Sequence, residues 1–176
     1  MPVRSLPSAA LTDAQLRAIR ALMDAAFEDF TDDDMDHGLG GRHFLLQADG
    51  ELVAHASVVE RALELDGRRL RAGYVEAVAV APARQRQGLG TEVMVAATGH
   101  IRETYELGAL GTGEQPFYEP LGWERWAGRS FVRERDGTLR RTADEEPWLM
   151  VLRTGPSAAL PLTGSLTCEW REGDVW

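Results

Sequence analysis

A buried strand followed by a glycine-containing turn and a helix constrains this chain more than any other part of its sequence. Residues 73–80 read Gly-Tyr-Val-Glu-Ala-Val-Ala-Val. They are small, β-branched and mostly apolar, as in a central strand. Pro82 ends the strand, and from Gly88 to about Thr104 the apolar residues recur at helical spacing. The sequence therefore predicts a strand, a turn and a helix in immediate succession.

The turn in this unit has the features of an anion site. It reads Gln85-Arg86-Gln87-Gly88-Leu89-Gly90. Glycine lets a ligand approach the backbone closely, and the N–H groups that begin a helix attract an anion such as a pyrophosphate. The turn is neither the GxGxxG motif of dinucleotide-binding folds nor a P-loop, which ends in Lys-Ser or Lys-Thr. Taken alone, these six residues fit a turn without a ligand equally well.

The rest of the chain predicts a single α/β domain over residues 1–176. Thr12-Asp13-Ala14-Gln15 has the form of a capping box and predicts a helix over 12–27. The pairs Asp49-Gly50 and Asp66-Gly67 predict tight turns between antiparallel strands. Further predicted elements are an acidic helix or loop at 29–36, a hairpin of strands at 43–47 and 51–59, a second pair of strands near 53–65 and 69–80, strands at 107–110, near 123–133 and near 148–153, a brief helix at 115–121, and a tail at 155–176. We expect a mixed, mostly antiparallel sheet with helices on both faces.

Charge and composition limit the kinds of ligand and partner that we expect for this protein. The formal net charge is −9, which disfavours nucleic acid and favours a polycationic ligand, although acidity that only maintains solubility explains it too. No apolar run approaches the roughly 20 residues of a membrane span, and no secretion signal is evident. The four histidines show no metal-ligand spacing, and the single cysteine, Cys168, suits a reducing cytoplasm. We therefore expect a cytoplasmic protein without a metal.

The strand and turn, Val78-Ala79-Val80 followed by Gln85 to Gly90, resemble the acetyl-coenzyme A signature of the GNAT superfamily of N-acetyltransferases. Motifs outside the turn resemble one branch of it, the aminoglycoside 2'-N-acetyltransferases, from about residue 11 to the end. They are Asp29-Phe30-Thr31 ahead of Leu39-Gly40-Gly41, Gly73 to Glu76, Tyr105 to Leu110, Tyr118 before Gly122-Trp123, and Cys168 to Trp176.

The resemblance implies the GNAT fold and direct transfer of an acetyl group from acetyl-CoA to the 2'-amine of an aminoglycoside. Glu76 would act as the base through water, and Tyr118 as the acid for the leaving thiolate. The implied acetyl-CoA contacts are Val78, Ala79, Val80, Gln85, Arg86, Gln87, Gly88, Leu89 and Gly90. The implied drug contacts are Asp29, Asp34, Glu76, Ala77, Gly111, Thr112, Asp144, Glu145, Asp174 and, through its terminal carboxylate, Trp176. Gly111-Thr112-Gly113 stands where the branch has a serine-rich run, so Thr112 supplies the hydroxyl or none is present.

Simpler interpretations stand beside these roles. Glu76 fits an outward polar residue of an edge strand, and Tyr118 fits core packing. The acidic runs fit solvated faces, and Trp176 fits a frayed or docked end. The acceptor is alternatively a polyamine, another amino sugar or a protein terminus, and a non-catalytic module that binds drug or coenzyme is the remaining option. Relatives often pair, and the apolar tail residues Leu160, Leu162 and Leu166 suggest a homodimer contact.

Overall fold

The computed structural model describes residues 2–176 and divides into two compact units, each of which is described by itself. The first unit comprises the described residues up to Val59 together with Val75–His100, and the second comprises Glu60–Tyr74 and Ile101–Trp176. Two long strands, β3 (Glu51–Leu65) and β4 (Arg68–Val80), contribute residues to both units. That residues 1–176 form one domain remains a prediction.

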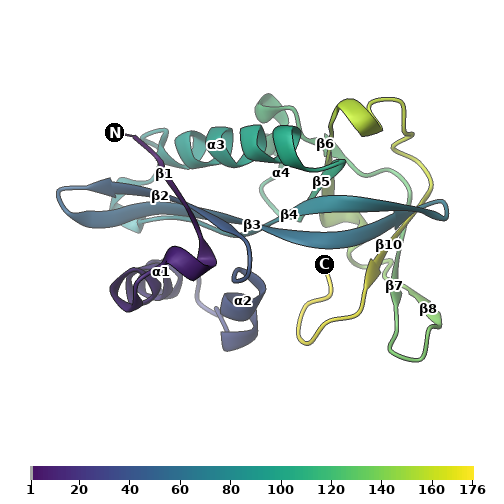
Figure 1. The fold of residues 1–176 in the computed structure, drawn as a ribbon, viewed down its shortest axis with the longest axis horizontal. Coiled ribbons are helices and arrows are strands. Elements are labelled where there is room, and N and C mark those ends of the chain that lie inside the picture. Colours follow the sequence, from purple (N-terminus) through teal and green to yellow (C-terminus); the bar gives the residue numbers. More distant parts are fainter. Residues whose placement is uncertain (1) are drawn as a thin grey trace. The chain divides into compact units, whose positions relative to one another are not determined.

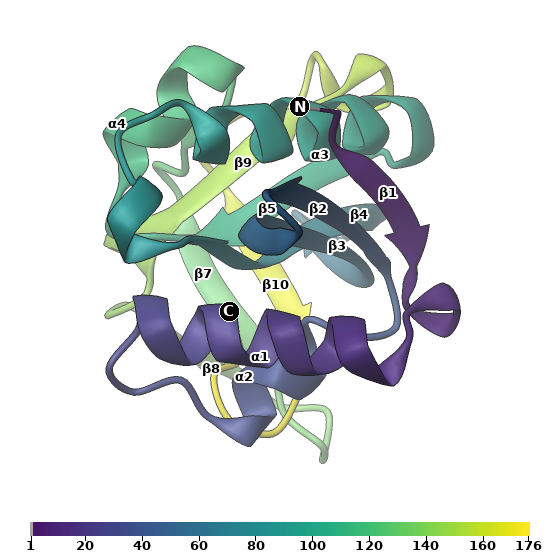
Figure 2. The ribbon, with the colours of Figure 1, turned by 90° about the vertical axis from the view of Figure 1, so that its left-hand side faces the viewer.

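In the first unit, four strands lie between helices. The order is β1 (Arg4–Pro7), β2 (Arg42–Ala48), β3 and β4, with β1 antiparallel to β2 and β2 antiparallel to β3. The helices α1 (Asp13–Ala26) and α2 (Asp32–His37) cover one face of these strands, and α3 (Leu89–Thr104) covers the other (Figures 1 and 2). Short 3-10 turns flank them at Ser8–Ala10 and Pro82–Arg84. The helices expected at 12–27 and 88–104 are confirmed.

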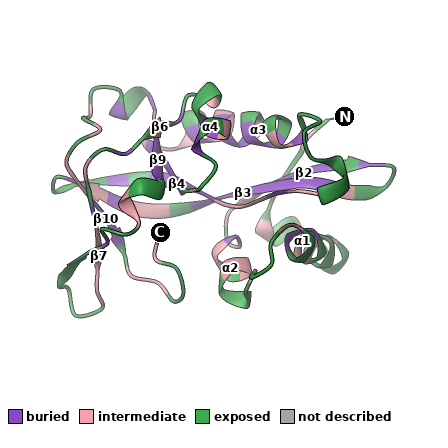
Figure 3. Cartoon of the chain, turned by 180° about the vertical axis from the view of Figure 1, so that it is seen from behind, coloured by how far each residue is buried: buried purple, intermediate pink, exposed green. Residues whose placement is uncertain are grey.

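Local sequence signals account for these elements. The Thr12 hydroxyl accepts the Gln15 N–H at 3.2 Å, and the Gln15 side chain accepts the Thr12 N–H at 2.9 Å, which completes the capping box. The apolar face of α1 packs on the sheet, with buried Ile19, Leu22 and Met23 against Leu45 and Ala79. Strands β2 and β3 are mostly buried, whereas much of the outer surface of the helices is exposed (Figure 3). Burial of one face therefore stabilises the helix against the strands.

Both predicted strand turns are present. Asp49 and Gly50 have φ values of 53° and 85°, and Asp66 and Gly67 have 49° and 84°. Two consecutive positive φ values are typical of the tight hairpin turn whose twist matches that of the strands it joins. The Asp-Gly pairs thus set the β2–β3 and β3–β4 connections.

Gly41 lies against the backbone of β3 and leaves no room for a side chain. A Cβ atom at this position would lie 2.0 Å from the Val58 carbonyl oxygen and 2.8 Å from the Val59 Cα. Because both neighbours are backbone atoms, Gly41→Ala should lower the free energy of unfolding by about 4 kcal/mol. Gly99→Ala is the control, since nothing lies within 4 Å of its added Cβ in the middle of α3. Urea denaturation should show Gly99→Ala as stable as the wild type or more so, and equal losses for both variants would contradict the packing.

The second unit contains an eight-stranded arrangement in which β3 and β4 are central. The order is β6 (Glu124–Arg125), β9 (Leu149–Arg153), β5 (Leu107–Gly111), β4, β3, β10 (Ser165–Glu169), β7 (Arg129–Arg133) and β8 (Leu139–Arg141). The β4–β5 and β7–β10 pairs are parallel, and the β5–β9, β6–β9, β3–β10 and β7–β8 pairs are antiparallel. The remaining elements are α4 (Gln115–Tyr118) and 3-10 turns at Glu119–Leu121, Glu146–Trp148 and Gly155–Ser157. The prediction of a mixed, mostly antiparallel α/β fold is confirmed.

The segment predicted as a tail contains a strand. Strand β10 pairs with β3 on one side and with β7 on the other, and Leu166, Thr167 and Cys168 are buried. Leu166 is therefore a core residue and not a dimer contact, whereas Leu160 and Leu162 are half-buried. The short strands β1 and β8 were not expected either. Among residues 2–176, no helix is long and apolar enough to cross a membrane.

Candidate active site

The first feature of the site is a bulge in β4. Ala77 has a φ of 50°, a left-handed conformation that costs a non-glycine residue about 1–3 kcal/mol. The carbonyl groups before and after the Ala77 Cα both accept hydrogen bonds from side chains of β3. The Glu76 carbonyl accepts from the Ser57 hydroxyl at 3.1 Å, and the Ala77 carbonyl accepts from the His55 ring at 2.7 Å. Side chains therefore take the place of backbone donors where the strand departs from regular geometry.

The edge of β4 beyond the bulge is the second feature. Strand β5 pairs with Ala72–Tyr74 of β4, in the second unit. Within the described first unit, β3 is the one strand beside Val75–Val80, and the other edge of these residues carries no strand. Ala79 packs into the core beneath α1, while Val78 and Val80 are half-buried. Such an edge can add one more extended group by main-chain hydrogen bonding.

The turn after β4 is exposed and shaped for an anion. Arg86 and Gly88 have positive φ values of 61° and 82°, and nothing lies within 4 Å of a Cβ built on Gly88. The Gly88 carbonyl accepts the Glu92 N–H at 3.1 Å, so the first turn of α3 starts here and its earlier N–H groups have no partner within the helix. A pyrophosphate fits this open, positively polarised cradle.

Three predicted acids of the first unit lie in different environments. Glu76 is half-buried on β4, and Asp29 is exposed between α1 and α2. The Asp34 carboxylate accepts hydrogen bonds from the Thr31 N–H at 2.9 Å and the Thr31 hydroxyl at 2.8 Å, so it caps α2. The end of α2 lies beside the bulge, because a Cβ on Gly38 would be 3.4 Å from the Ala77 Cβ.

Tyr118 belongs to the second unit and is 7% exposed. Its ring makes edge-to-face contacts with Phe117 and Trp123, at centroid distances of 4.8 Å and 6.4 Å. Burial raises the pKa of the Tyr118 hydroxyl to about 12, and Glu114 adds to the rise, while a hydrogen bond with Thr112 opposes it. The hydroxyl thus keeps its proton at neutral pH. Packing and a chemical role are both compatible with this environment.

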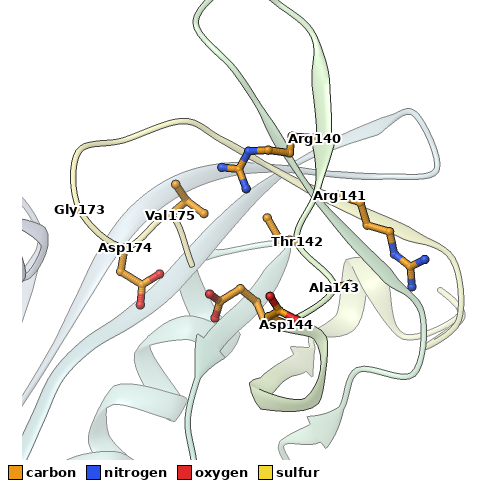
Figure 4. Close-up of a pocket in the computed structure, with 9 residues that line it drawn as sticks. Arg140, Arg141, Thr142, Ala143, Asp144, Gly173, Asp174 and Val175 are labelled. Atoms are coloured by element: carbon orange, nitrogen blue, oxygen red, sulfur yellow. The ribbon is translucent and has the colours of Figure 1, made fainter.

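An acidic cavity is the most distinctive feature of the second unit. It has a volume of about 340 Å³ and is lined by Arg140–Glu145 and Gly173–Val175. Asp144 follows β8, and Asp174 comes from the C-terminal segment (Figure 4). Burial raises the pKa of Glu145, and the negative charges of Asp174 and Asp144 raise it further, so the three carboxylates share one site.

The arginines of this cavity are already paired with other acids. Arg140 binds Glu134 at 2.6 Å, and Arg141 binds Glu146 at 3.0 Å. The salt bridges formed within the described part of the chain include none from Asp144, Glu145 or Asp174. The three carboxylates of the cavity can therefore pair with an incoming cation without breaking a salt bridge of the described residues.

The C-terminal segment is docked and forms one wall of this cavity. The indole of Trp176 is buried and donates to the Thr142 hydroxyl at 2.9 Å. A main-chain oxygen of the terminal Trp176 accepts from the Arg171 guanidinium at 3.3 Å, and the Trp176 N–H donates to the Asp174 carboxylate at 3.2 Å. These bonds hold Asp174 toward the cavity, and Thr142, which sequence reasoning did not single out, anchors them.

The predicted site residues are divided between the two units. The first unit holds Asp29, Asp34, Glu76 to Val80 and the turn Gln85 to Gly90, and the second holds Gly111, Thr112, Tyr118, Asp144, Glu145, Asp174 and Trp176. Sequence reasoning also missed His43, His55 and Ser57, which carried no motif. Within residues 2–176, no group of three or more His, Cys, Asp or Glu residues is arranged to hold a metal ion.

The first unit thus combines a strand with a bulge, an edge with no strand beside it and an exposed turn suited to an anion, an arrangement that fits a ligand with an extended arm and a pyrophosphate. Residues 9–126 match the model of the acetyltransferase (GNAT) domain, so the chain belongs to the GNAT acetyltransferase family. It is 43% identical over 162 residues to the aminoglycoside 2'-N-acetyltransferase of Mycolicibacterium fortuitum, covering 89% of this chain and 83% of that protein.

Solved structures agree with the fold. The GNAT acetyltransferase YhbS of Escherichia coli, in complex with CoA, has a TM-score of 0.69 at 19% identity and covers 95% of this chain and 88% of its own. A GNAT acetyltransferase of Brucella melitensis in complex with acetyl-CoA has a TM-score of 0.62 at 15% identity, with 94% of each chain covered. The predicted GNAT fold and N-acetyltransferase class are confirmed.

Proposed function

We propose that this protein transfers the acetyl group of acetyl-CoA to the 2'-amine of an aminoglycoside. The observation that carries the choice of acceptor is the cavity with Asp144, Glu145 and Asp174, whose two lining arginines form salt bridges with Glu134 and Glu146. Aminoglycosides carry several ammonium groups, which such a site attracts. The M. fortuitum relative named for this activity supports the same acceptor.

The first unit would bind acetyl-CoA. Its pantetheine arm would pair with the free edge of β4 at Val78–Val80, and its pyrophosphate would lie on the amides around Gly88. The positive φ of Gly88 and the empty space around it suit this contact, which a side chain would obstruct. Backbone N–H groups at the Ala77 bulge would polarise the thioester carbonyl as charge develops on its oxygen.

The chemistry removes two protons from the substrate nitrogen. An ammonium cannot attack a thioester, so Glu76, through a water molecule, would accept the first proton. The amine nitrogen then forms a bond with the acetyl carbon, and the carbon–sulfur bond breaks. Tyr118, protonated at neutral pH, would donate to the departing thiolate, and the second proton, which the nitrogen loses as it becomes an amide, would replace the one that the tyrosine gave up. Alignment of the two reactants contributes the largest share, on the order of 7–11 kcal/mol.

Cys168 does not fit an acyl-enzyme route. Its side chain is buried within β10, and burial raises the pKa of the thiol to about 11. A protonated, enclosed thiol is a poor nucleophile. Direct transfer between the two substrates is therefore the proposed route. The proposal also places the enzyme in the cytoplasm and includes neither a metal nor a nucleic-acid partner. A homodimer remains a prediction.

The decisive experiment is thiol release by the purified protein supplied with acetyl-CoA and an acceptor. Gentamicin or tobramycin should release free CoA, with mass spectrometry placing one acetyl group on the 2'-nitrogen. Kasugamycin, spermidine, glucosamine and a peptide amine complete the panel. Release with spermidine and none with the aminoglycosides would reassign the enzyme to polyamines, and binding without release would make it a binding module.

Removing the acids of the cavity should weaken drug binding. Glu145→Gln and Asp174→Asn should each raise KM for the drug by about 10-fold, since a charged hydrogen bond contributes roughly 1.5–3 kcal/mol. Their residual binding should also depend less on salt. Glu103→Gln, on the exposed end of α3, is the control and should leave KM unchanged. Equal KM values for all three variants would exclude the cavity from substrate binding.

The pH dependence of KM follows from the raised pKa of Glu145. As pH falls, this carboxylate takes up a proton at a higher pH than an ordinary glutamate, so its attraction for a cation is lost earlier. In Asp174→Asn the neighbouring charge is gone, and the pKa of Glu145 should fall. Kinetics in mildly acidic buffers should therefore show the rise in KM moving to lower pH in this variant. An unshifted profile would show that the two acids are not coupled.

A further inference from the structure

We propose that His55, oriented by His43, is a positioning residue that fixes the Ala77 bulge for acetyl transfer. The inference rests on the proposed function in one respect, that the thioester lies along β4. It concerns neither the acceptor nor the proton transfers. All of the residues involved belong to the first unit.

A chain of short hydrogen bonds leads to the bulge. The Ser8 hydroxyl lies 2.7 Å from His43 Nε2, and His43 Nδ1 lies 2.9 Å from His55 Nε2. His55 Nδ1 then lies 2.7 Å from the Ala77 carbonyl oxygen. Both rings are enclosed, with His43 1% and His55 0% exposed. Four residues that are distant in sequence thus form one continuous polar path through the sheet.

The carbonyl at the end of the path sets its direction. A carbonyl oxygen accepts and never donates, so His55 must carry its proton on Nδ1, which leaves Nε2 as an acceptor. His43 must then donate from Nδ1, and its own Nε2 must accept from the Ser8 hydroxyl, whose single proton is therefore directed to His43 at 2.7 Å and not to the Gly41 carbonyl oxygen at 3.2 Å. Burial lowers the pKa of His43 to about 4 and that of His55 to about 3, so both rings are neutral at physiological pH.

The bulge needs such a support because its backbone is strained. His55 and Ser57 lie two residues apart on β3, so their side chains share one face of the sheet. They donate to the consecutive carbonyls of Ala77 and Glu76 on either side of the left-handed turn. Two buried donors therefore hold both peptide groups in the orientation that would direct backbone N–H groups toward the thioester.

The first test needs no variant. Nitrogen-15 NMR of the histidine rings in the wild-type protein reports which nitrogen carries the proton. The expected result is the Nδ1–H tautomer for both His43 and His55 at neutral pH. A proton on Nε2 of His55, or a charged His55 ring, would overturn the proposal directly.

The second test separates positioning from packing. His55→Asn keeps a donor close to the place of Nδ1, whereas His55→Leu keeps bulk without a donor. The leucine variant should lose about 100-fold in kcat, the cost of a small misplacement of reacting groups, and the asparagine variant should recover most of it. Val58→Ala, on the opposite face of the same strand, is the control that lowers stability and leaves kcat unchanged. Equal losses in His55→Asn and His55→Leu would show a role in packing alone.

A comparison of cofactors makes the inference independent of the acceptor. Acetyl-CoA has the thioester carbonyl and CoA does not, so His55→Leu should weaken acetyl-CoA binding by on the order of 5-fold more than CoA binding in calorimetry. If the wild type fails to acetylate aminoglycosides while this difference holds, the proposed acceptor is wrong and the positioning role stands. If the difference is absent in a folded His55→Leu protein, the positioning role is wrong whatever the acceptor.

Discussion

Replacing Glu76 by glutamine is expected to lower kcat by about 10²- to 10⁴-fold, the usual contribution of a general base. The amide has nearly the same shape and cannot accept a proton, so the amine stays protonated in the ground state and attack on the thioester is suppressed. Because the turn at Gln85–Gly90 and the β4 edge are unchanged, calorimetry should give the wild-type affinity for acetyl-CoA. The part of the pH–rate profile that reports the base should disappear.

Glu51→Gln provides the matched control for this experiment. Glu51 is an exposed carboxylate at the start of β3 in the same unit, and its removal should leave both kcat and acetyl-CoA affinity unchanged. An unaltered kcat in Glu76→Gln would remove Glu76 from the mechanism. It would then favour the simpler interpretation of an outward polar side chain.

Tyr118→Phe is expected to lower kcat by about 10²- to 10³-fold, the effect of losing one hydrogen-bond donor that acts in the transition state. The phenyl ring keeps the contacts with Phe117 and Trp123, so the midpoint of thermal unfolding should change little. Since the pKa of Tyr118 is raised to about 12, the hydroxyl does not titrate in the ordinary assay range. The loss should therefore be the same at neutral and at moderately alkaline pH.

Phe117→Leu separates the acid role from packing. It disturbs the same aromatic cluster and leaves the Tyr118 hydroxyl in place, so it should lower stability by about 1 kcal/mol and leave kcat within a few-fold of the wild type. If Tyr118→Phe unfolds the protein and leaves the rate per folded molecule intact, the tyrosine is a packing residue. A large rate loss in both variants would point to a general sensitivity of this segment.

Features encoded within a few consecutive residues could be predicted from the sequence. The capping box at Thr12 precedes helix α1, as predicted, and both Asp-Gly pairs have the positive φ values of tight turns. Gly88 ends the strand-to-helix turn with a φ of 82°. In each case the preference is local, because it depends on a hydrogen bond or a steric limit among neighbouring residues. The resemblance to GNAT enzymes likewise depended on short motifs.

Features that depend on distant partners could not be predicted in this way. Strand β10 is only five residues long and has no strong alternation, and it is stable because β3 and β7 supply partners on both sides. The left-handed conformation of Ala77 could not be predicted from its residue type, since alanine rarely adopts that conformation. His43 and His55 are twelve residues apart with no ligand spacing, and the β2–β3 pairing is what places their rings 2.9 Å apart.

The substrate site shows the same division. From sequence alone, the acidic runs near residues 32–34 and 144–146 are more typical of solvated faces than of a binding site. The tertiary structure assigned Asp34 to capping α2, and it raised the pKa of Glu145 by burying this side chain and by placing it near Asp174. Thus the chain alone determined the class of turn, the hairpins and the cofactor signature, through contacts among near neighbours. The tertiary structure decided which acids share a cavity and how the bulge is held, because those contacts join segments up to 35 residues apart in sequence.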